Sequence, residues 1–341
     1  MNRIRGDNML EIGSVVDEKY RILCEIGRGG MSIVYMAVNE RINRTCAIKE
    51  VYRHGGVDFD EIKKGFMIEI EMLRRLSHAH LPNINDVIDK EDTFLIVMDY
   101  IEGNTLDKSL QEFGPQPQEL VFDWAKQLCN VLGYLHTRKP PIIYRDVKPS
   151  NIMLKPDGNL ILIDFGTARE FKEENLADTT CLGTLGYAAP EQFGGRGQTD
   201  ARTDIYGLGA TLYHLVTGKN PCDPPYELLP IRKINPALSA RLQKIIQKCT
   251  KNDPDDRYQS CEELMYELEH YVFLNLPRKI NFYRKPLNIL ISIIKSRKRN
   301  NDAEKENSAI SNSFVTDDPK IIKYNANLIK MQHDDSANME L

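Results

Sequence analysis

The sequence has few of the features that mark secreted, nucleic-acid-binding or zinc-stabilised proteins. Its 341 residues carry a formal net charge of −4, which favours neither nucleic acid nor an acidic surface as a partner of the whole chain. The seven cysteines are odd in number, and no pair has close metal-type spacing. A disulfide framework or a zinc site is therefore not expected, and a reducing cytosol fits best.

Long apolar runs are missing as well. The N-terminus has no apolar stretch like that of a signal peptide. The apolar run Leu287–Ile294 is too short to span a bilayer. We also find no internal repeat at a fixed period. The hydrophobic fraction of 41% is nevertheless enough for a folded core.

The pattern of apolar residues changes along the chain. Between about residues 20 and 100 they alternate or form short runs broken by Gly, Asn and Asp, which predicts strands and turns. One helix interrupts them, with its buried face marked by Phe66, Ile70, Leu73 and Leu76. After Gly103 helical periodicity dominates. Helices are predicted around 204–217, 238–250 and 260–272, and a strand pair over 152–154 and 160–163.

These patterns predict an α+β fold with two lobes, a small mainly β lobe followed by a larger mainly helical lobe. The expected division is a leader over 1–16, a folded domain over 17–273 with its lobes at about 17–100 and 101–273, a basic and apolar segment over 274–299, and a polar, disordered tail over 300–341.

A glycine-rich stretch near the N-terminus is the first candidate for chemistry. Gly27-Arg28-Gly29-Gly30-Met31-Ser32 lies between two predicted strands, and glycines let backbone amides approach phosphate oxygens closely. Taken alone, a glycine cluster between two strands is more often just a turn. Lys49 follows, and it could pair with phosphate if a carboxylate held it in place. Glu69 on the predicted helix is our candidate, although Glu61 and Glu71 are also near in sequence.

The block Tyr144-Arg145-Asp146-Val147-Lys148-Pro149-Ser150-Asn151, followed by Asp164-Phe165-Gly166 and Ala189-Pro190-Glu191, decides the interpretation. With the glycine loop, Lys49 and Glu69 before them, these motifs resemble the eukaryotic-type (Hanks-type) serine/threonine protein kinases, and their bacterial branch in particular. The resemblance covers about three quarters of the chain. One departure is Tyr144, where the family usually has a histidine that packs against the phenylalanine of Asp-Phe-Gly, and the tyrosine ring is expected to do the same. The resemblance also implies that Glu191 and Arg257 form a buried ion pair and that Asp204 anchors the backbone of the catalytic loop.

The resemblance implies a role for each residue. Asp146 would accept or orient the proton of the substrate hydroxyl, Lys148 would reach the γ-phosphate, and Asn151 and Asp164 would bind Mg²⁺, with Mn²⁺ as a substitute. Lys49, held by Glu69, would bind the α- and β-phosphates of ATP. The remaining nucleotide-binding residues implied are Ile26, Gly27, Arg28, Gly29, Gly30, Met31, Ser32, Val34, Ala47, Met98, Asp99, Ile101 and Met153. Of these, Asp99 and Ile101 would hydrogen bond adenine through their backbone, Asp99 by its carbonyl.

Lys148 and Thr184 also imply the acceptor, because serine/threonine kinases have these residues in the catalytic loop and after the activation loop. We therefore predict transfer of the ATP γ-phosphoryl group to Ser or Thr of proteins. Arg145 implies switching by activation-loop phosphorylation, with Arg169 as a second basic partner and Thr179 and Thr180 as acceptors. Cys181 in that loop is either a redox switch or a bystander.

Residues 278–299 hold eight Lys or Arg and no acid around the apolar run. Two interpretations stay open: a helix lying on an anionic membrane surface, or a last helix docked on the larger lobe with a solvated basic end. The expected location is cytoplasmic, with or without contact to the inner face of the membrane. The sequence indicates neither a substrate, nor an input signal, nor an oligomeric state.

Two rival functions differ in class. A pseudokinase would bind ATP or protein without transfer, but such proteins usually lose a residue equivalent to Lys49, Asp146 or Asp164. A kinase of small molecules or lipids would keep the chemistry and change the acceptor. The context of Lys148 and Thr184, together with the Ala-Pro-Glu segment, argues against it.

Overall fold

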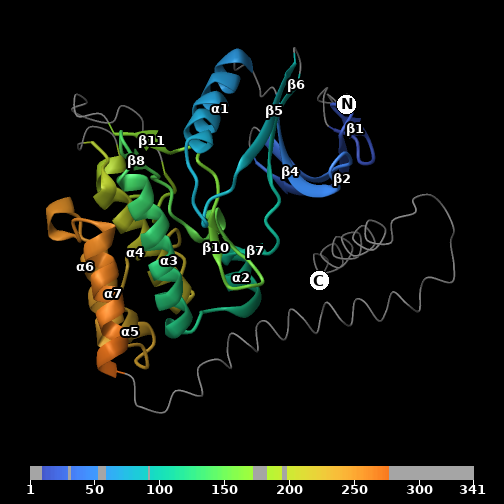
Figure 1. The fold of residues 1–341 in the computed structure, drawn as a ribbon. Helices are drawn as coiled ribbons and strands as arrows, with labels where there is room; N and C mark the ends of the chain where they lie inside the picture. The colour runs from blue at the N-terminus through green and yellow to red at the C-terminus, as the bar shows by residue number, and fades with distance from the viewer. Residues whose placement is uncertain are drawn as a thin grey trace, which may run out of the picture. The chain divides into compact units, whose positions relative to one another are not determined.

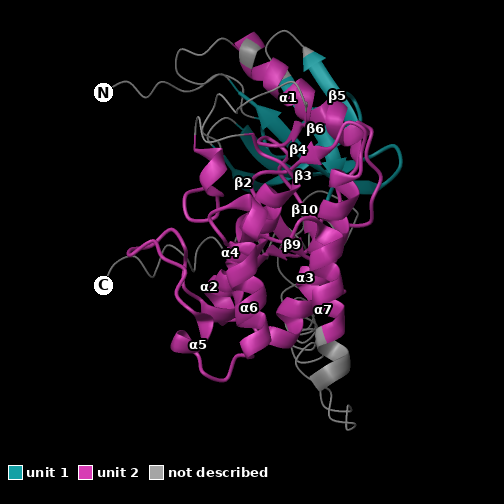
Figure 2. Ribbon diagram, turned by 90° about the vertical axis from the view of Figure 1, so that its left-hand side faces the viewer, with its two compact units in different colours: residues 1–56, 85–100, 282–341 teal, residues 57–84, 101–281 magenta. Residues whose placement is uncertain are grey.

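A computed structural model of the protein describes residues 10–29, 32–52, 59–90, 93–171, 183–193 and 198–275. These residues form two compact units, drawn in two colours in Figure 2. Unit 1 holds the described residues up to 52 and those within 85–100, and unit 2 holds 59–84 and 101–275. Each unit is described by itself.

Unit 1 is a six-stranded sheet of order β1-β2-β3-β4-β6-β5. The strands are β1 (Val15–Val16), β2 (Tyr20–Arg28), β3 (Ser32–Asn39), β4 (Arg44–Val51), β5 (Ile84–Lys90) and β6 (Thr93–Asp99). Strands β1 to β4 pair antiparallel in sequence order, and β6 pairs antiparallel with β4. Predicted strands over 33–38, 46–48 and 94–98 fall within β3, β4 and β6.

One face of this sheet carries the core of unit 1. Because side chains alternate along a strand, Ile33, Tyr35 and Ala37 of β3 lie on the same face as Ile48 of β4 and Val97 of β6, and all of them are buried. A buried carboxylate, Glu50, lies on this face and accepts hydrogen bonds from the Tyr35 hydroxyl at 3.0 Å and the Leu10 amide at 3.1 Å. The opposite face carries a smaller buried cluster of Leu23, Met36 and Val38, and its remaining part is the candidate ligand face.

Unit 2 is mainly helical (Figure 1). Its helices are α1 (Phe59–Arg74), α2 (Leu106–Phe113), α3 (Gln118–His136), α4 (Ala201–Thr217), α5 (Ile231–Ile234), α6 (Ala240–Cys249) and α7 (Cys261–Asn275), with single 3₁₀ turns η1 (Pro149–Asn151), η2 (Pro190–Gln192) and η3 (Pro254–Asp256). The short strands β7 (Asn104–Thr105), β9 (Ile152–Leu154) and β10 (Leu160–Leu162) form one sheet of order β10-β9-β7, and β8 (Ile142–Ile143) pairs with β11 (Arg169–Glu170).

Helix α4 forms the centre of unit 2. From Thr203 to Thr217 every residue except Tyr206 is buried, and α4 packs against both α3 and α6, while α3 packs along α7 (Figure 1). Its ends follow from local chemistry: the Asp200 carboxylate accepts the Arg202 amide at 2.8 Å, and Gly218 closes the helix with a left-handed φ of 66°. The helix is therefore a rigid support for loops that contact it.

The predicted helices around 204–217, 238–250 and 260–272 correspond to α4, α6 and α7, and the predicted strand pair corresponds to β9 and β10. One difference concerns α1. The prediction counts residues 59–84 in the small lobe, and the structure groups them with unit 2, so the expected lobe boundaries stay a prediction. The leader before residue 10, the segment 278–299 and the tail 300–341 lie outside the described residues.

Candidate active site

The predicted phosphate loop of unit 1 is a tight connection between β2 and β3. Gly27 pairs with Val34 and Arg28 with Ile33, and the Gly29 amide donates to the Ser32 carbonyl at 2.8 Å. Ile26 is 42% exposed beside a register shift in β2. Gly30 and Met31 lie outside the described residues.

The ligand face of the unit 1 sheet collects several predicted nucleotide-binding residues. In the antiparallel register, Val34 of β3 is opposite Lys49 of β4, and Ala47 of β4 is opposite Met98 of β6. Directly paired residues and those two positions apart share a face, so all four point to the side opposite the unit 1 core. Lys49 thus stands between apolar residues of the kind that would contact a purine ring.

The end of β6 is held by polar contacts. The Asp99 carboxylate accepts from Arg44 Nη2 at 2.9 Å and from Asn85 Nδ2 at 3.1 Å. Its side chain is therefore engaged with unit 1, which is consistent with the prediction that Asp99 serves the adenine through its backbone carbonyl. Ile101 is the first residue of unit 2 after this strand, and half-buried Met153 lies on β9.

In unit 2 the predicted catalytic residues converge on Asp146. Lys148 Nζ lies 2.7 Å from Asp146 Oδ2 and donates to Thr184 Oγ1 at 2.6 Å, while the Thr184 hydroxyl donates to Asp146 Oδ1 at 2.9 Å. Asn151 Nδ2 donates to Asp146 Oδ2 at 2.9 Å and to the Asp146 carbonyl at 3.1 Å. Asp146 is only 7% exposed, so its charge is stabilised by these donors.

The backbone before Asp146 is held in an uncommon conformation. Arg145 has φ of 68°, in the left-handed region that non-glycine residues rarely adopt. Asp204 of α4 stabilises it: Oδ1 accepts the Arg145 amide at 2.6 Å, and Oδ2 accepts the Tyr144 amide at 2.9 Å. The prediction that Asp204 anchors the catalytic loop is thereby confirmed, and such conformations cluster at functional sites.

The Asp-Phe-Gly segment is also locally constrained. Asp164 has φ of 65°, and its Oδ1 accepts the Gly166 amide at 3.2 Å. The Phe165 ring packs edge-to-face on Tyr144, with centroids 5.1 Å apart, and the Tyr144 hydroxyl donates to the Ile163 carbonyl. Tyr144 therefore packs against Phe165 as predicted for the aromatic replacing histidine, and it adds a hydrogen bond.

Glu69 contacts the same segment. It is 9% exposed on α1, and its Oε1 accepts the Phe165 amide at 3.3 Å. Glu71, the alternative partner for Lys49, is exposed. Burial therefore favours Glu69, but Lys49 belongs to unit 1 and Glu69 to unit 2, so their pairing stays a prediction.

Of the predicted metal ligands, Asn151 has chemistry that suits the role. Its amide nitrogen is committed to Asp146, which leaves the carbonyl oxygen Oδ1 as the atom available to a cation. Asp164 adds a carboxylate, and Mg²⁺ prefers oxygen ligands of these types. The donor set of unit 2 therefore fits a magnesium ion bound mainly through phosphate and water.

The regulatory residues are only partly within the described chain. Arg145 is 8% exposed, and its Nε donates to the Thr167 carbonyl at 2.6 Å. Arg169 lies on β11, paired with Ile143 of β8. Thr179, Thr180 and Cys181 lie outside the described residues.

The segment after the activation loop is braced by buried polar contacts. The Arg257 guanidinium bonds both carboxylate oxygens of Glu191, at 2.7 and 2.9 Å, which confirms the predicted ion pair. Gln192 donates to the Arg145 carbonyl at 2.8 Å and so ties η2 to the catalytic loop. A Cβ at Gly183, where φ is 121°, would lie 2.6 Å from that same Gln192 side chain. Sequence reasoning did not single out Gln192.

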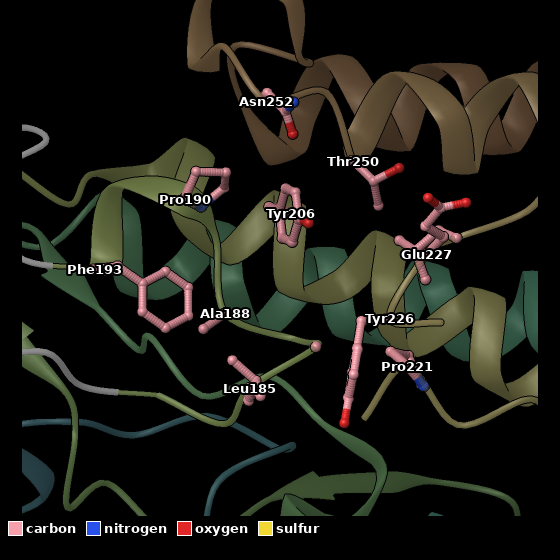
Figure 3. Close-up of a pocket in the computed structure, with 12 residues that line it drawn as sticks. Leu185, Ala188, Pro190, Phe193, Tyr206, Pro221, Tyr226, Glu227, Thr250 and Asn252 are labelled. Atoms are coloured by element: carbon pink, nitrogen blue, oxygen red, sulfur yellow. The ribbon is translucent and has the colours of Figure 1, made fainter. Parts of the chain in front are cut away.

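A groove of about 770 Å³ opens beside this segment (Figure 3). Three of the large apolar side chains that line it, Leu185, Phe193 and Tyr226, are 60%, 37% and 61% exposed. Exposed apolar surface of this kind marks sites of protein interaction. Its lining comes from segments between residues 185 and 252. Pro190 belongs to the Ala-Pro-Glu motif, but the other segments carry no motif that predicts a groove.

The comparisons with known proteins agree with this geometry. The protein kinase domain profile matches residues 20–268, and the chain belongs to the protein kinase family. Three of its relatives are bacterial proteins named as serine/threonine-protein kinases. A probable serine/threonine-protein kinase of Clostridium acetobutylicum is 34% identical over 271 residues, covering 76% of this chain and 41% of that protein.

Two further relatives show the same coverage. Serine/threonine-protein kinase PrkC of Bacillus subtilis is 31% identical over 270 residues, which cover 76% of this chain and 41% of that protein. PknB of Mycobacterium leprae is 30% identical over 270 residues, with 74% and 43% covered. The chain thus spans about two fifths of the length of these relatives. In the described part of this chain, no helix has the length and apolar character of a membrane span.

Proposed function

We propose that this protein transfers the γ-phosphoryl group of ATP to serine or threonine hydroxyls of proteins. The observation that carries the proposal is the network in which Asp146 is contacted by Lys148, Thr184 and Asn151 at 2.6–3.1 Å. A scaffold that only bound nucleotide would not need a lysine, a hydroxyl and an amide aligned on one carboxylate.

Each member of the network has a part in the transfer. Asp146 orients the acceptor hydroxyl and takes its proton, and Lys148, 2.7 Å from Asp146 Oδ2, supplies positive charge where the γ-phosphoryl oxygens become more negative. Thr184 fixes the spacing between the two. The loose transition state of phosphoryl transfer needs such positioning and charge more than covalent help.

The nucleotide and its metal would be bound by the residues that the motifs identify. Asn151 and Asp164 would hold Mg²⁺ or Mn²⁺, and Lys49, positioned by Glu69, would hold the α- and β-phosphates. Val34, Ala47, Met98 and Met153 would contact adenine, and the backbone of Asp99 and Ile101 would hydrogen bond it. The bound cation neutralises phosphate charge during transfer.

We further propose control by phosphorylation of the protein itself. Thr179 or Thr180 would receive a phosphate, and Arg145 and Arg169 would bind it, since guanidinium and phosphate form strong charge-assisted hydrogen bonds. The protein substrate would dock along the groove beside the Ala-Pro-Glu segment. The proposed location is the cytoplasm, and for 278–299 we keep two alternatives, contact with the inner face of the membrane or docking on the larger lobe.

The test is incubation of the protein with ATP and Mg²⁺, followed by mapping of phosphosites by mass spectrometry. We expect Ser and Thr phosphorylation of a general protein acceptor and of the 171–185 peptide. Asp146→Asn should lower the rate at least about 100-fold, within the range for loss of a general base, while its thermal unfolding stays cooperative.

Two outcomes would contradict the proposal. A folded protein that binds ATP but labels no hydroxyl would be a pseudokinase, and labelling of lipids or small molecules alone would change the acceptor class. If transfer occurs but the 171–185 peptide stays unmodified, only the self-phosphorylation proposal fails.

A further inference from the structure

Two buried thiols meet between the long helices of unit 2. Cys129 on α3 is 2% exposed, and Cys261, the first residue of α7, is 3% exposed. On α3, Cys129 shares a face with Gly133, one turn later, and Cys261 Cβ lies 3.5 Å from the position that a Cβ on Gly133 would occupy. The two helices pack side by side along this region (Figure 1), so the thiols are held close by elements that are themselves well packed.

One of the thiols also belongs to a polar chain that reaches the catalytic loop. Cys261 Sγ lies 3.6 Å from His136 Nδ1, and His136 Nε2 lies 2.8 Å from Asp204 Oδ2. Asp204 in turn accepts the amides of Tyr144 and Arg145, directly before Asp146. A thiol, an imidazole and a carboxylate are thus lined up in the order that activates a cysteine.

The surroundings favour the charged form of Cys261 over that of Cys129. The hydrogen bond from Cys129 and then the neighbouring His136 lower the pKa of Cys261, against the opposing effect of burial. The hydrogen bond to Cys261 and burial raise the pKa of Cys129. Burial disfavours a charged His136, but Cys261 and Asp204 raise its pKa. The position of Cys261 at the N-terminus of α7 favours a thiolate further.

From this cluster we infer that Cys261 and Cys129 form a peroxide-responsive thiol pair, in which Cys261 is oxidised first and Cys129 then closes a disulfide between α7 and α3. The burial of both sulfurs restricts the oxidant to a small neutral hydroperoxide such as hydrogen peroxide. Glu262, next to Cys261, is exposed, so the start of α7 is the short way in from solvent.

The chemistry balances in two steps. In the first, the Cys261 thiolate attacks one peroxide oxygen, the O–O bond breaks, and the leaving hydroxide takes a proton from His136 to become water. Cys261 is then a sulfenic acid. In the second, the Cys129 sulfur displaces hydroxide from Cys261, the S–S bond forms, and the Cys129 proton leaves with the hydroxide as a second water. Two thiols are oxidised and one peroxide is reduced.

The oxidised pair should slow catalysis through Asp204. Disulfide formation removes the thiolate that faces His136, and His136 is a hydrogen-bond partner of the carboxylate holding the Tyr144 and Arg145 amides. We expect kcat to fall severalfold with little change in KM for ATP. This readout rests on the proposed kinase function, whereas detection of the disulfide does not.

The experiment treats the full-length protein with hydrogen peroxide, alkylates the remaining thiols and maps disulfides by mass spectrometry without reduction. The expected result is a Cys129–Cys261 linked peptide, about 2 Da lighter than the two free peptides together, and its loss on treatment with dithiothreitol. Cys261→Ser and Cys129→Ser should form no such bridge, and peroxide should not lower the kcat of either variant below the value that the same variant has without peroxide. Cys24→Ser, a change in unit 1, should behave like the wild type.

Disulfide mapping of the wild-type protein tests the proposal even if a serine variant fails to fold. Cys261→Ala is a second variant, whose side chain has no polar atom. The proposal is overturned if peroxide oxidises only Cys181 or Cys222. It is also overturned if no cysteine is oxidised and both Cys129 and Cys261 can still be alkylated after unfolding. Inactivation of Cys261→Ser by peroxide to the same extent as the wild type would remove the proposed effect on catalysis.

Discussion

The Thr184 hydroxyl accepts a hydrogen bond from Lys148 Nζ at 2.6 Å and donates one to Asp146 Oδ1 at 2.9 Å. Replacement of Thr184 by Ala removes both bonds from charged groups, each worth about 1.5–3 kcal/mol. We therefore expect kcat of Thr184→Ala to fall about 10- to 100-fold, measured by steady-state transfer to a protein acceptor. Thr184→Ser, which keeps the hydroxyl, should retain most of the activity.

Thr137→Ala is a matched control for this prediction. Thr137 is an exposed threonine whose hydroxyl donates to the Tyr134 carbonyl within the same unit. Its loss should leave kcat unchanged. A wild-type kcat for Thr184→Ala would show that Lys148 and Asp146 are positioned without the hydroxyl.

At the scale of single residues, the motifs identified most of the candidate site residues in unit 2. Asp146, Lys148 and Asn151 lie within six consecutive residues, so a motif identifies them together. No motif could identify the series of polar contacts from Cys261 through His136 to Asp204, because Cys261 and His136 are 125 positions apart in the sequence. Only the packing of α3 against α7 brings them into contact.

At the scale of elements, the Glu191–Arg257 pair joins η2 to the turn after η3. Both arginine terminal nitrogens bond the carboxylate, and the Arg257 side chain is 0% exposed. Arg257 also donates to the carbonyls of Lys251, Arg202 and Asn252. Arg257→Met should therefore lower the free energy of unfolding by about 3–5 kcal/mol, because Glu191 stays buried without its cation.

Denaturant titration of the two single variants and of Glu191→Gln/Arg257→Met measures this cost. The double variant should lose less than the sum of the two single losses. Arg241→Ala is the control, because the side chains of its ion pair with Glu267 at 3.0 Å are 28% and 40% exposed, and a pair this accessible to solvent should be worth less than about 1 kcal/mol. Equal effects at Arg257 and Arg241 would show that burial adds nothing to the pair.

Long periodic elements were predictable and short ones were not. Helices α4, α6 and α7 begin and end within three residues of their predicted limits, since 3.6-residue periodicity accumulates over ten or more residues. The two-residue strands β7, β8 and β11 carry no periodic signal. Each exists because tertiary contacts complete its hydrogen bonds, as when Arg169 pairs with Ile143.

At the scale of the whole molecule, the pattern of apolar residues separated the strand-rich from the helix-rich part. It could not assign α1, whose residues 59–74 lie between strands in sequence but cluster with unit 2. An amphipathic helix shows that one face is buried but not which element buries it. For the same reason, apolar and basic residues in 278–299 do not reveal whether protein or lipid covers them.

The membrane alternative predicts a charge-dependent affinity. Lys295, Arg297, Lys298 and Arg299 follow the apolar run directly, and each basic residue near an anionic surface contributes about 1 kcal/mol. The full-length protein should therefore co-sediment with vesicles containing phosphatidylserine and much less with phosphatidylcholine alone. Changing these four residues to Gln should weaken that binding by up to ~4 kcal/mol, as should raising the salt concentration.

The control keeps the net charge change and moves it to the catalytic domain. Lys219, Lys233, Lys244 and Lys251 are exposed residues of unit 2, and their joint replacement by Gln removes four positive charges outside the segment. If both quadruple variants bind vesicles equally well, the basic segment is not the membrane contact, and docking on the kinase domain becomes the better interpretation. If only the variant changed at 295–299 loses vesicle binding, the basic segment itself is the membrane contact. A general attraction between the positive charges of the protein and anionic lipid would have been weakened by either set of changes.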